Sequence, residues 1–290
     1  MGFADLKKSS GKFDKLQNEL EKLNSPTQTS SFQDDRFWKP ELDKSGNGYA
    51  IIRFLPQAAD EELPWVRLWN HAFKGPGGWY IENSLTTINK KDPVSEYNTE
   101  LWNSGNESDK DVARKQKRVL KYYANIYVVS DSKHPEHEGK VMLFKFGKKI
   151  FDKITEAMNP EFADEEALNP FDLWKGANFK LKIRKVDGYW NYDKSEFAAP
   201  TQLLESDDEL EEVWKKEHSL KAFIDPTQFK NYDELKEKLN RVLTGSGVGS
   251  ATVSDITEAP KSAKTVEYQE PVTAEADEDT INYFSKLANE

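Results

Sequence analysis

The sequence contains no cysteine, so it can form neither a disulfide framework nor a metal site with thiolate ligands. It has no run of eighteen uncharged apolar residues, which is the minimum expected of a membrane-spanning helix. Its first residues lack the apolar stretch of a secretory signal peptide. We therefore expect a protein of the reducing cytoplasm.

The sequence also lacks the short motifs that mark common enzyme active sites. It has no G-x-x-x-x-G-K-[ST] loop, no G-x-G-x-x-G segment after a strand and no G-x-S-x-G turn. His134 and His137 could form half of a metal site, but no third ligand follows at a familiar spacing. The acidic run at 205–212 fits a solvated helix face. We predict neither catalysis nor a bound metal.

Positive charge is scarce overall, with a net charge of −10 over 290 residues, but it is concentrated in one segment. Residues 110–153 contain twelve Lys or Arg and five Asp or Glu, whereas residues 244–290 contain three and nine. Such segregation predicts a basic binding face and an acidic tail. A solvated charged surface would give the same counts, so charge alone leaves both interpretations open.

Alternating and aromatic segments predict a β-rich domain over residues 31–243. The expected strands are 49–55, 65–73, 79–81, 122–129, 141–146 and 179–186, and the expected helices are 148–158, 206–214 and 232–243. The last strand alternates strictly between apolar and cationic residues, so its two faces should differ. Short strands separated by turns indicate a barrel or a sandwich.

The two ends of the chain differ from this domain. Residues 1–30 contain a short amphipathic helical pattern and then a polar break, which predicts an arm. Residues 244–290 begin with a Gly- and Ser-rich linker and continue as a polar, acidic segment, so we predict a disordered tail. Apolar residues return at 281–287, which favours a partner-docking motif over a helix that packs on the domain.

Cations and aromatic residues occur together at three places, 114–123, 144–149 and 189–194. Cations neutralise phosphates and release counterions. Aromatic rings stack on exposed bases, which contributes about 1–3 kcal/mol per base with little sequence preference. The combination predicts binding of single-stranded nucleic acid. Some of these rings must belong to the core, because Tyr122 and Tyr123 point to opposite faces of their strand.

Several stretches of the sequence match one family in the same order along the chain. They are residues 47–56, 70–73, 78–82, 122–129, 138–141, 146–150, 174–179 and 191–193. Over residues 40–240 the chain resembles the single-stranded DNA-binding (helix-destabilising) proteins of T4-like bacteriophages. Collinear matches over this length are much more specific than any one motif.

The resemblance implies a mainly β, α+β fold with an OB-fold barrel core. It also implies a non-enzymatic protein that coats single-stranded DNA cooperatively during phage replication, recombination and repair in the host cytoplasm. With the basic clusters, it gives these DNA-binding residues: Tyr97, Lys117, Arg118, Lys121, Tyr122, Phe144, Lys148, Tyr189 and Tyr192. The arm, through Lys7, Lys8, Ser9 and Ser10, would contact a neighbouring protomer. The acidic tail would recruit replication and recombination proteins and compete with DNA for the basic cleft.

One departure from the family concerns a structural zinc ion. The resembled relatives hold zinc with one His and three Cys, whereas this chain has His71, Ser84, Asp92 and Ser95 at those positions. Serine is a poor zinc ligand, so we predict no zinc and no other cofactor. The 74–98 segment is then expected to be a loop that is either mobile or ordered by its own aromatic residues.

Two other functions remain open from the sequence. A protein-interaction scaffold could act through the acidic tail and the arm, with an incidental basic face. A nuclease would cleave single strands in the presence of magnesium. Titration with a fluorescent oligothymidine separates binding from both.

Overall fold

The computed structural model describes residues 34–162, 164–186 and 189–245. The chain divides into one compact unit of residues 1–35 and another of residues 36–290, and the description below concerns the second. Lys7, Lys8, Ser9 and Ser10 lie outside the described residues, as does the acidic tail after Gly245. The predicted roles of the arm and the tail therefore stay predictions.

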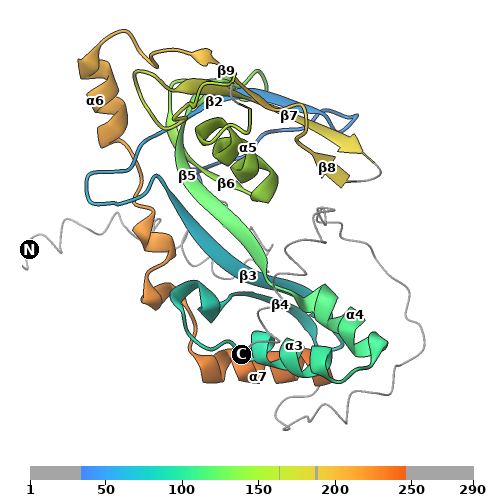
Figure 1. Cartoon of the computed structure of the whole chain (residues 1–290). Helices are drawn as coiled ribbons and strands as arrows, with labels where there is room; N and C mark the ends of the chain where they lie inside the picture. Colours follow the sequence, from blue (N-terminus) through green and yellow to red (C-terminus); the bar gives the residue numbers. More distant parts are fainter. Residues whose placement is uncertain (1–33, 163, 187–188, 246–290) are drawn as a thin grey trace, which may run out of the picture. The chain divides into compact units, whose positions relative to one another are not determined.

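The described residues form one mixed sheet of nine strands (Figure 1). The pairing order is β1-β6-β5-β2-β7-β8, while β3 pairs with β4 and β5, and β9 pairs with β7. Within the described residues, the two ends of this order do not pair with each other. The strands are β1 (Phe37–Trp38), β2 (Gly48–Phe54), β3 (Trp65–Gly75), β4 (Gly78–Asn83), β5 (Val119–Ser130), β6 (Val141–Phe146), β7 (Ala177–Val186), β8 (Tyr189–Asn191) and β9 (Glu196–Pro200).

The long strand β5 connects the two halves of the sheet. Its first half pairs with β3, its second half pairs with β2, and β6 runs antiparallel along its other edge. Residues 122–126 of β5 are all buried, so both of its faces are covered there. A strand buried on both faces reads as a continuous apolar run. The sequence YYANIYVV has this character.

Five α-helices accompany the sheet in the described part of the chain: α3 (Pro93–Asn103), α4 (Glu107–Gln116), α5 (Lys148–Met158), α6 (Asp207–Lys215) and α7 (Tyr232–Thr244). Short 3-10 turns are η2 (Leu85–Ile88), η3 (Pro135–His137), η4 (Lys221–Phe223) and η5 (Pro226–Gln228). Helix α5 inserts Ile150 and Ile154 into the main core, beside Phe54 and Phe179. Burial of each of these side chains contributes about 1.5–3 kcal/mol.

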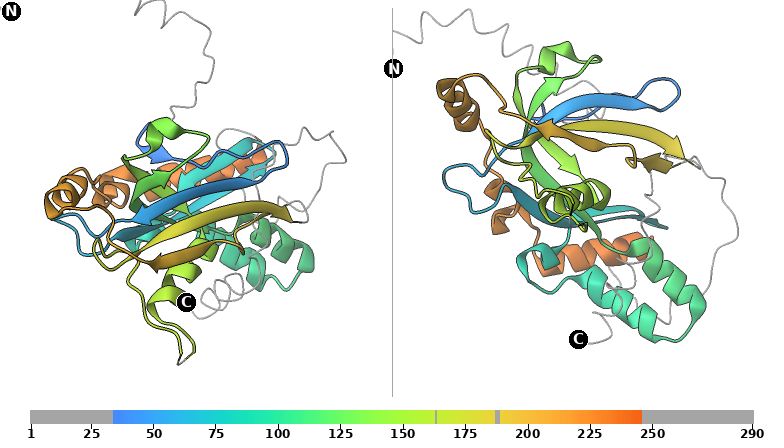
Figure 2. Two further views of the ribbon diagram at one scale, coloured as in Figure 1. Left: turned by 90° about the horizontal axis from the view of Figure 1, so that it is seen from above. Right: turned by 45° about the horizontal axis from the view of Figure 1, so that its top comes forward.

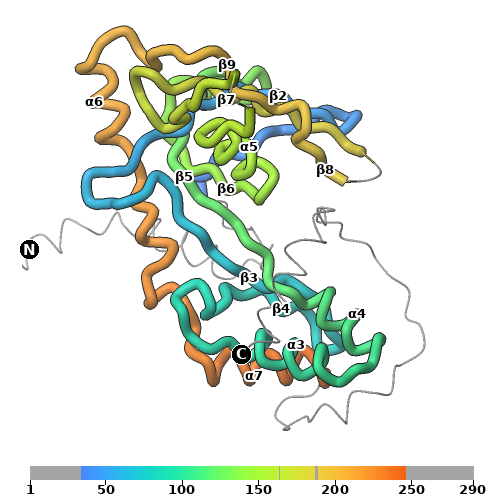
Figure 3. Tube along the Cα trace, in the orientation of Figure 1, coloured from blue at the N-terminus to red at the C-terminus, as the bar shows by residue number. Residues whose placement is uncertain are grey.

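A second core joins the β3–β4 hairpin to α3 and α7. It contains Phe73, Tyr80, Val94 and Leu239, and the rings of Phe73 and Tyr80 stack with centroids 5.0 Å apart. Helix α7 is therefore packed against strands more than 140 residues earlier in the chain. Figure 2 shows α3, α4 and α7 grouped on the side of the hairpin, and Figure 3 traces α7 beside α3.

The approach of α7 to the hairpin is close because the turn contains glycine. The amide of Gly77 donates to the carbonyl oxygen of Val242 at 2.8 Å. A Cβ atom at Gly77 would lie only 1.9 Å from the carbonyl oxygen of Arg241. Only glycine permits this packing of backbone on backbone.

The α+β class is confirmed, and several elements fall where the sequence places them. Helix α5 has the expected bounds, and β7 buries Phe179, Leu181 and Ile183 while Arg184 is exposed. Of the two alternatives for residues 74–98, the structure has the ordered one, and the strand expected at 79–81 is β4, but the segment is more regular than a loop. That segment forms β4, η2 and the start of α3, because Tyr80 is buried and Asp92 caps α3.

Candidate nucleic-acid interface

Alternate residues of β3 place two rings and a cation on one face of the sheet. Trp65, Arg67 and Trp69 share this face because side chains alternate along a strand. The register with β5 sets Arg67 opposite Tyr122, and Trp69 opposite Leu120. Arg67 is exposed, and both tryptophans are partly exposed. The face therefore presents aromatic surface next to positive charge.

This face opens into a cleft of about 1530 Å³. Its aromatic side chains are Trp65 and Trp69, and its cations are Arg67, Lys90, Lys91, Arg118 and Lys221. Five acidic residues also line it: Glu61, Glu62, Asp92, Glu96 and Glu100. Since the formal charges are equal in number, the local potential depends on which charges are already paired.

Two of the acidic residues are engaged by neighbouring side chains. Asp92 pairs with buried His71, and Glu96 accepts a hydrogen bond from the hydroxyl of Tyr232. Within the part of the chain that the structure describes, Lys90 and Lys91 form no ion pair. Arg67 likewise forms none with a described residue. These three cations are therefore available to contact an anion, although the lining as a whole carries no net formal charge.

Arg118, which the sequence analysis predicts to bind DNA, lies in this cleft. Its guanidinium carbon is 4.4 Å from the ring centroid of Trp69, within range of a cation–π interaction. The contact holds a cation and an aromatic ring side by side on the surface. Trp69, together with Trp65 and Arg67, is missing from the predicted set, although the alternating, tryptophan-rich segment 65–73 was the available signal.

Tyr122 and Phe144 are also predicted DNA contacts, but both rings belong to the main core. Tyr122 is 6% exposed and stacks on Phe151 with centroids 3.9 Å apart, and Phe144 is 4% exposed and packs edge-on against Trp38. A base could stack on either ring only after its neighbours moved. Tyr122 and Phe144 are thus among the clustered aromatic residues that belong to the core. Their role in DNA contact remains a prediction.

The predicted lysines occupy three different settings. Lys117 lies between α4 and β5, close in sequence to Arg118. Lys121 is opposite Leu68 on the sheet face that Tyr122 does not share. Lys148 begins α5 and forms an ion pair with Asp152 at 2.8 Å. Of the predicted cations, the structure therefore brings only Arg118 into the cleft lining.

The remaining predicted tyrosines do not line the cleft within the described residues. Tyr189 is 42% exposed on β8, and Tyr192 packs against the main core. Tyr97 is on α3, where burial and then the charges of Asp109 and Glu100 raise its pKa to about 12. Tyr189 is thus the one of the three with a largely exposed ring.

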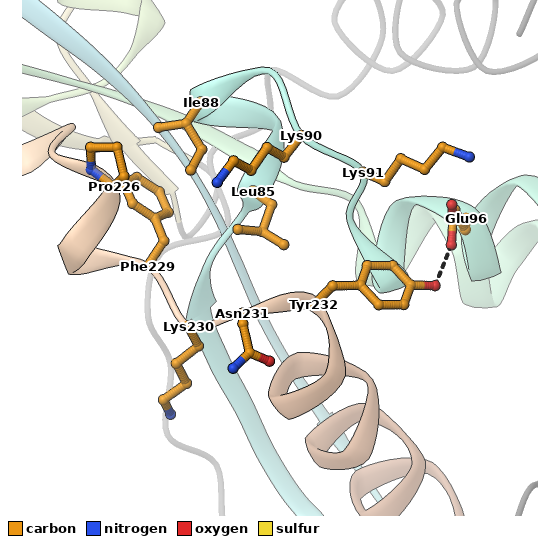
Figure 4. Close-up of a pocket in the computed structure, with 10 residues that line it drawn as sticks. All are labelled: Leu85, Ile88, Lys90, Lys91, Glu96, Pro226, Phe229, Lys230, Asn231 and Tyr232. Atoms are coloured by element: carbon orange, nitrogen blue, oxygen red, sulfur yellow. Dashed lines mark hydrogen bonds between the residues drawn. The ribbon is translucent and has the colours of Figure 1, made fainter.

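A smaller pocket of about 590 Å³ adjoins the cleft and shares Lys90, Lys91 and Glu96 with it (Figure 4). The figure shows Leu85, Ile88 and Phe229 toward one side of this pocket, and the Tyr232 hydroxyl directed at Glu96. Lys230 also lines it, and its ammonium group pairs with Glu82. The pocket combines apolar side chains with a cationic rim.

In the family that this chain resembles, four positions bind zinc. The residues at those positions in this chain do not fit a zinc ion. Asp92 accepts hydrogen bonds from the amides of Leu85, Val94 and Ser95 at 3.0–3.1 Å, so its oxygens already have partners. His71 directs Nδ1 at the carbonyl oxygen of Gln116, 2.9 Å away, and Nε2 at Asp92, 3.3 Å away. The hydroxyl groups of Ser84 and Ser95 are weak zinc ligands. The buried contact of His71 with Asp92 occupies this place.

None of the helices that the structure describes combines the length and apolar character needed to cross a bilayer.

Comparison with known proteins gives a consistent result. A family model described as gp32 DNA binding protein like matches residues 46–243. The chain is similar to the single-stranded DNA-binding protein of Enterobacteria phage T2, with 39% identity over 242 residues, 80% of this chain and 78% of that protein. It is 38% identical over 257 residues to the single-stranded DNA-binding protein of Enterobacteria phage T4, which covers 86% of this chain and 83% of that protein.

Proposed function

The chain belongs to the gp32-like family of bacteriophage single-stranded DNA-binding proteins, and we propose that it binds and coats single-stranded DNA without sequence specificity. The observation that carries the proposal is the cleft in which Trp65, Arg67, Trp69 and Arg118 lie on one face. The two arginines can contact the phosphates of a single strand, and the two tryptophans can stack on the faces of its bases.

The expected energetics follow from these contacts. Each phosphate neutralised on a single strand gives a slope of about −0.7 in a plot of log affinity against log salt. If Arg67, Arg118, Lys90 and Lys91 each contact a phosphate, the slope is about −2.8. Each tryptophan that stacks on a base adds about 1–3 kcal/mol. Neither contact reads base identity, so the binding should tolerate any sequence.

We further propose that the strands around the main core are those of an OB-fold barrel, as in the resembled family. β1, β6, β5, β2 and β7 surround the cluster of Phe54, Ile126 and Phe179, which supports a barrel-like core. The proposed domain organisation is an arm over residues 1–30, a DNA-binding domain over 31–243 and a tail over 244–290. The arm makes coating cooperative by contacting the next protomer.

The acidic tail is proposed to recruit phage replication and recombination proteins and to compete with DNA for the cleft. Its sequence carries a net charge of −6 over residues 244–290, opposite in sign to Lys90 and Lys91. Charges of opposite sign on a tether attract each other within about a Debye length. Deletion of residues 246–290 should therefore tighten binding at low salt, and weaker binding after deletion would contradict the competition.

We also propose that the protein is not an enzyme, that it holds no zinc at His71 and that it acts in the cytoplasm of the infected host. The hydrogen bonds of Asp92 support the zinc-free state, since its oxygens already accept from the amides of Leu85, Val94 and Ser95. A chelator such as EDTA should leave DNA affinity unchanged. Magnesium-dependent cleavage of a labelled single strand would overturn the non-enzymatic assignment.

The test is a titration of the full chain with oligothymidine at several salt concentrations, followed by tryptophan emission. We expect quenching, because Trp65 and Trp69 line the cleft, and an affinity that falls as salt rises. In the double variant K90A/K91A the slope should become less steep by about 1.4. Lys175 is exposed and does not line the cleft, so K175A is the matched control.

Two results would refute the proposal. The first is an absence of binding at micromolar protein, which favours a scaffold that acts through the tail and the arm. The second is an equal change of slope in K90A/K91A and K175A, which would mean that DNA does not use this cleft.

A further inference from the structure

The loop between β5 and β6 gathers two histidines and a glutamate at one point. Ligand atoms of His134, Glu136 and His137 all lie within 4.8 Å of one another. His134 Nδ1 is 3.0 Å from a carboxylate oxygen of Glu136, and the two imidazole rings have centroids 5.1 Å apart. This cluster is separate from the cleft and from His71.

A fourth group reaches the cluster from a distant part of the sequence. Glu41, in the connection between β1 and β2, places a carboxylate oxygen 2.9 Å from His134 Nε2. The sequence shows His134 and His137 with no third ligand at a familiar spacing. The fold brings Glu136 to the same point and adds Glu41 from 93 residues earlier in the chain.

Buried and partly buried hydrogen bonds hold the backbone of this loop in place. Asp131 is 2% exposed, and it accepts from the amides of Lys133 and His134 at 3.1 and 3.2 Å. Its other oxygen accepts from the indole of Trp38 at 2.8 Å. Glu138 accepts from the Asp131 amide at 2.7 Å. The two imidazoles therefore project from a loop whose backbone is fixed by hydrogen bonds.

We propose that His134, His137 and Glu136 form a binding site for a divalent transition-metal ion of the zinc class, with Glu41 as an adjacent carboxylate. Zn²⁺ binds imidazole nitrogen and carboxylate oxygen at about 2.0–2.2 Å. Two such ligands at angles of 90–110° are about 3.0–3.4 Å apart, which agrees with the His134–Glu136 distance. Two imidazoles on one ion at these bond lengths have centroids roughly 5 Å apart, as observed.

The donor set also selects the kind of metal. Imidazole suits zinc, cobalt, nickel and copper, whereas magnesium and calcium take oxygen ligands. His137 Nδ1 is buried and has no hydrogen-bond partner among the described residues, so this nitrogen is available as a ligand. The site should therefore prefer Zn²⁺ and Co²⁺ to Mg²⁺.

Protons compete with the metal for the same nitrogen atoms. The hydrogen bond to Glu136 and the negative charges of Glu136, Asp131 and Glu41 outweigh partial desolvation and raise the pKa of His134. Metal can bind only when the imidazole is neutral.

The test is a calorimetric titration of the full, untagged chain with ZnCl₂ and with MgCl₂ at pH 7.5. We expect one zinc ion per chain, and more than tenfold weaker binding of magnesium. The double variant H134Q/H137Q should lose more than about tenfold in zinc affinity, because removal of an outer partner alone costs 10–100-fold. E136Q should weaken binding less.

His218 is the matched control, because it is a histidine outside the cluster. H218Q should bind zinc as the natural chain does. The proposal is overturned if the natural chain binds no zinc at 100 µM, or if H134Q/H137Q, folded by circular dichroism, binds as tightly as H218Q. Oligothymidine binding is measured in parallel, and its result does not depend on this site.

Discussion

Replacement of Asp92 by Ala should destabilise the protein strongly, because one buried carboxylate holds several groups together. Asp92 is 2% exposed and pairs with His71, which is fully buried. It also caps α3 through the amides of Val94 and Ser95, and binds the amide of Leu85. In D92A all of these partners are left in a region from which water is excluded.

The magnitude follows from the two largest losses. Removal of one partner of a buried ion pair costs about 3–5 kcal/mol. Loss of an N-cap side chain costs about 0.5–2 kcal/mol, and part of this overlaps with the first loss. We expect a total of about 3–5 kcal/mol, or a melting temperature lower by roughly 6–20 °C. D92N keeps a capping oxygen but loses the charge, so it should be affected less.

The pH dependence gives a second readout. Burial favours the neutral form of Asp92, but His71 and the backbone amides outweigh it and lower the pKa of Asp92 to about 2 from 3.8. A lowered pKa in the folded state stabilises the fold above pH 3.8, and this stabilisation is lost as the pH falls toward 2. The difference corresponds to about 2 kcal/mol. D92N should lack this contribution.

The assay is urea denaturation followed by far-ultraviolet circular dichroism between pH 2.5 and pH 7, with and without EDTA. Asp164 is exposed, and D164A serves as the control. The reasoning fails if D92A stays within 1 kcal/mol of the natural chain at pH 7. It also fails if the stability curves of D92N and the natural chain are parallel over the acidic range.

Three further predictions concern other parts of the molecule. R67A should make the salt dependence of oligothymidine binding less steep by about 0.7, and an unchanged slope would show that Arg67 does not contact phosphate. G77A should lower the free energy of unfolding in urea by about 1–3 kcal/mol, because its methyl group would collide with the carbonyl oxygen of Arg241. Burial, and then the charge of Glu61, raises the pKa of Glu217 to about 8, so stability should fall as pH rises from about 5 through 8. E217Q should remove that decline in a pH series of thermal melts, and an unchanged decline would show that another group titrates.

Strictly periodic elements could be predicted from the sequence because local patterns determine them. β7 alternates because one of its faces packs on the core, and α5 repeats its apolar residues at helical spacing. The strand at 79–81 was expected, but η2 and α3 were missed because the order of this segment comes from distant partners. Tyr80 is buried against α7, and α7 lies about 150 residues later in the chain.

The sequence predicted the types of residue in the candidate site but not which individual residues form it. A mixture of cations and rings was visible, but composition does not show which rings are covered. Phe144 lies under Trp38, and Tyr122 lies under Phe151, because both faces of the sheet are packed at these positions. Lys90 and Lys91 lie in a short connection between η2 and α3, and Asp92 sets its position. Because a connection has no periodic sequence pattern, the sequence does not mark these two lysines as part of the site.

The His71–Asp92 contact and the cleft are one structural unit. Lys90 and Lys91 immediately precede Asp92, and the amide of Lys90 bonds to the carbonyl oxygen of Leu85, whose own amide bonds to Asp92. Trp69, across the cleft, donates its amide to the hydroxyl of Thr87 in the same segment at 2.9 Å. The His71–Asp92 pair therefore fixes two cations at a defined distance from a tryptophan. Loss of Asp92 should therefore weaken DNA binding as well as folding.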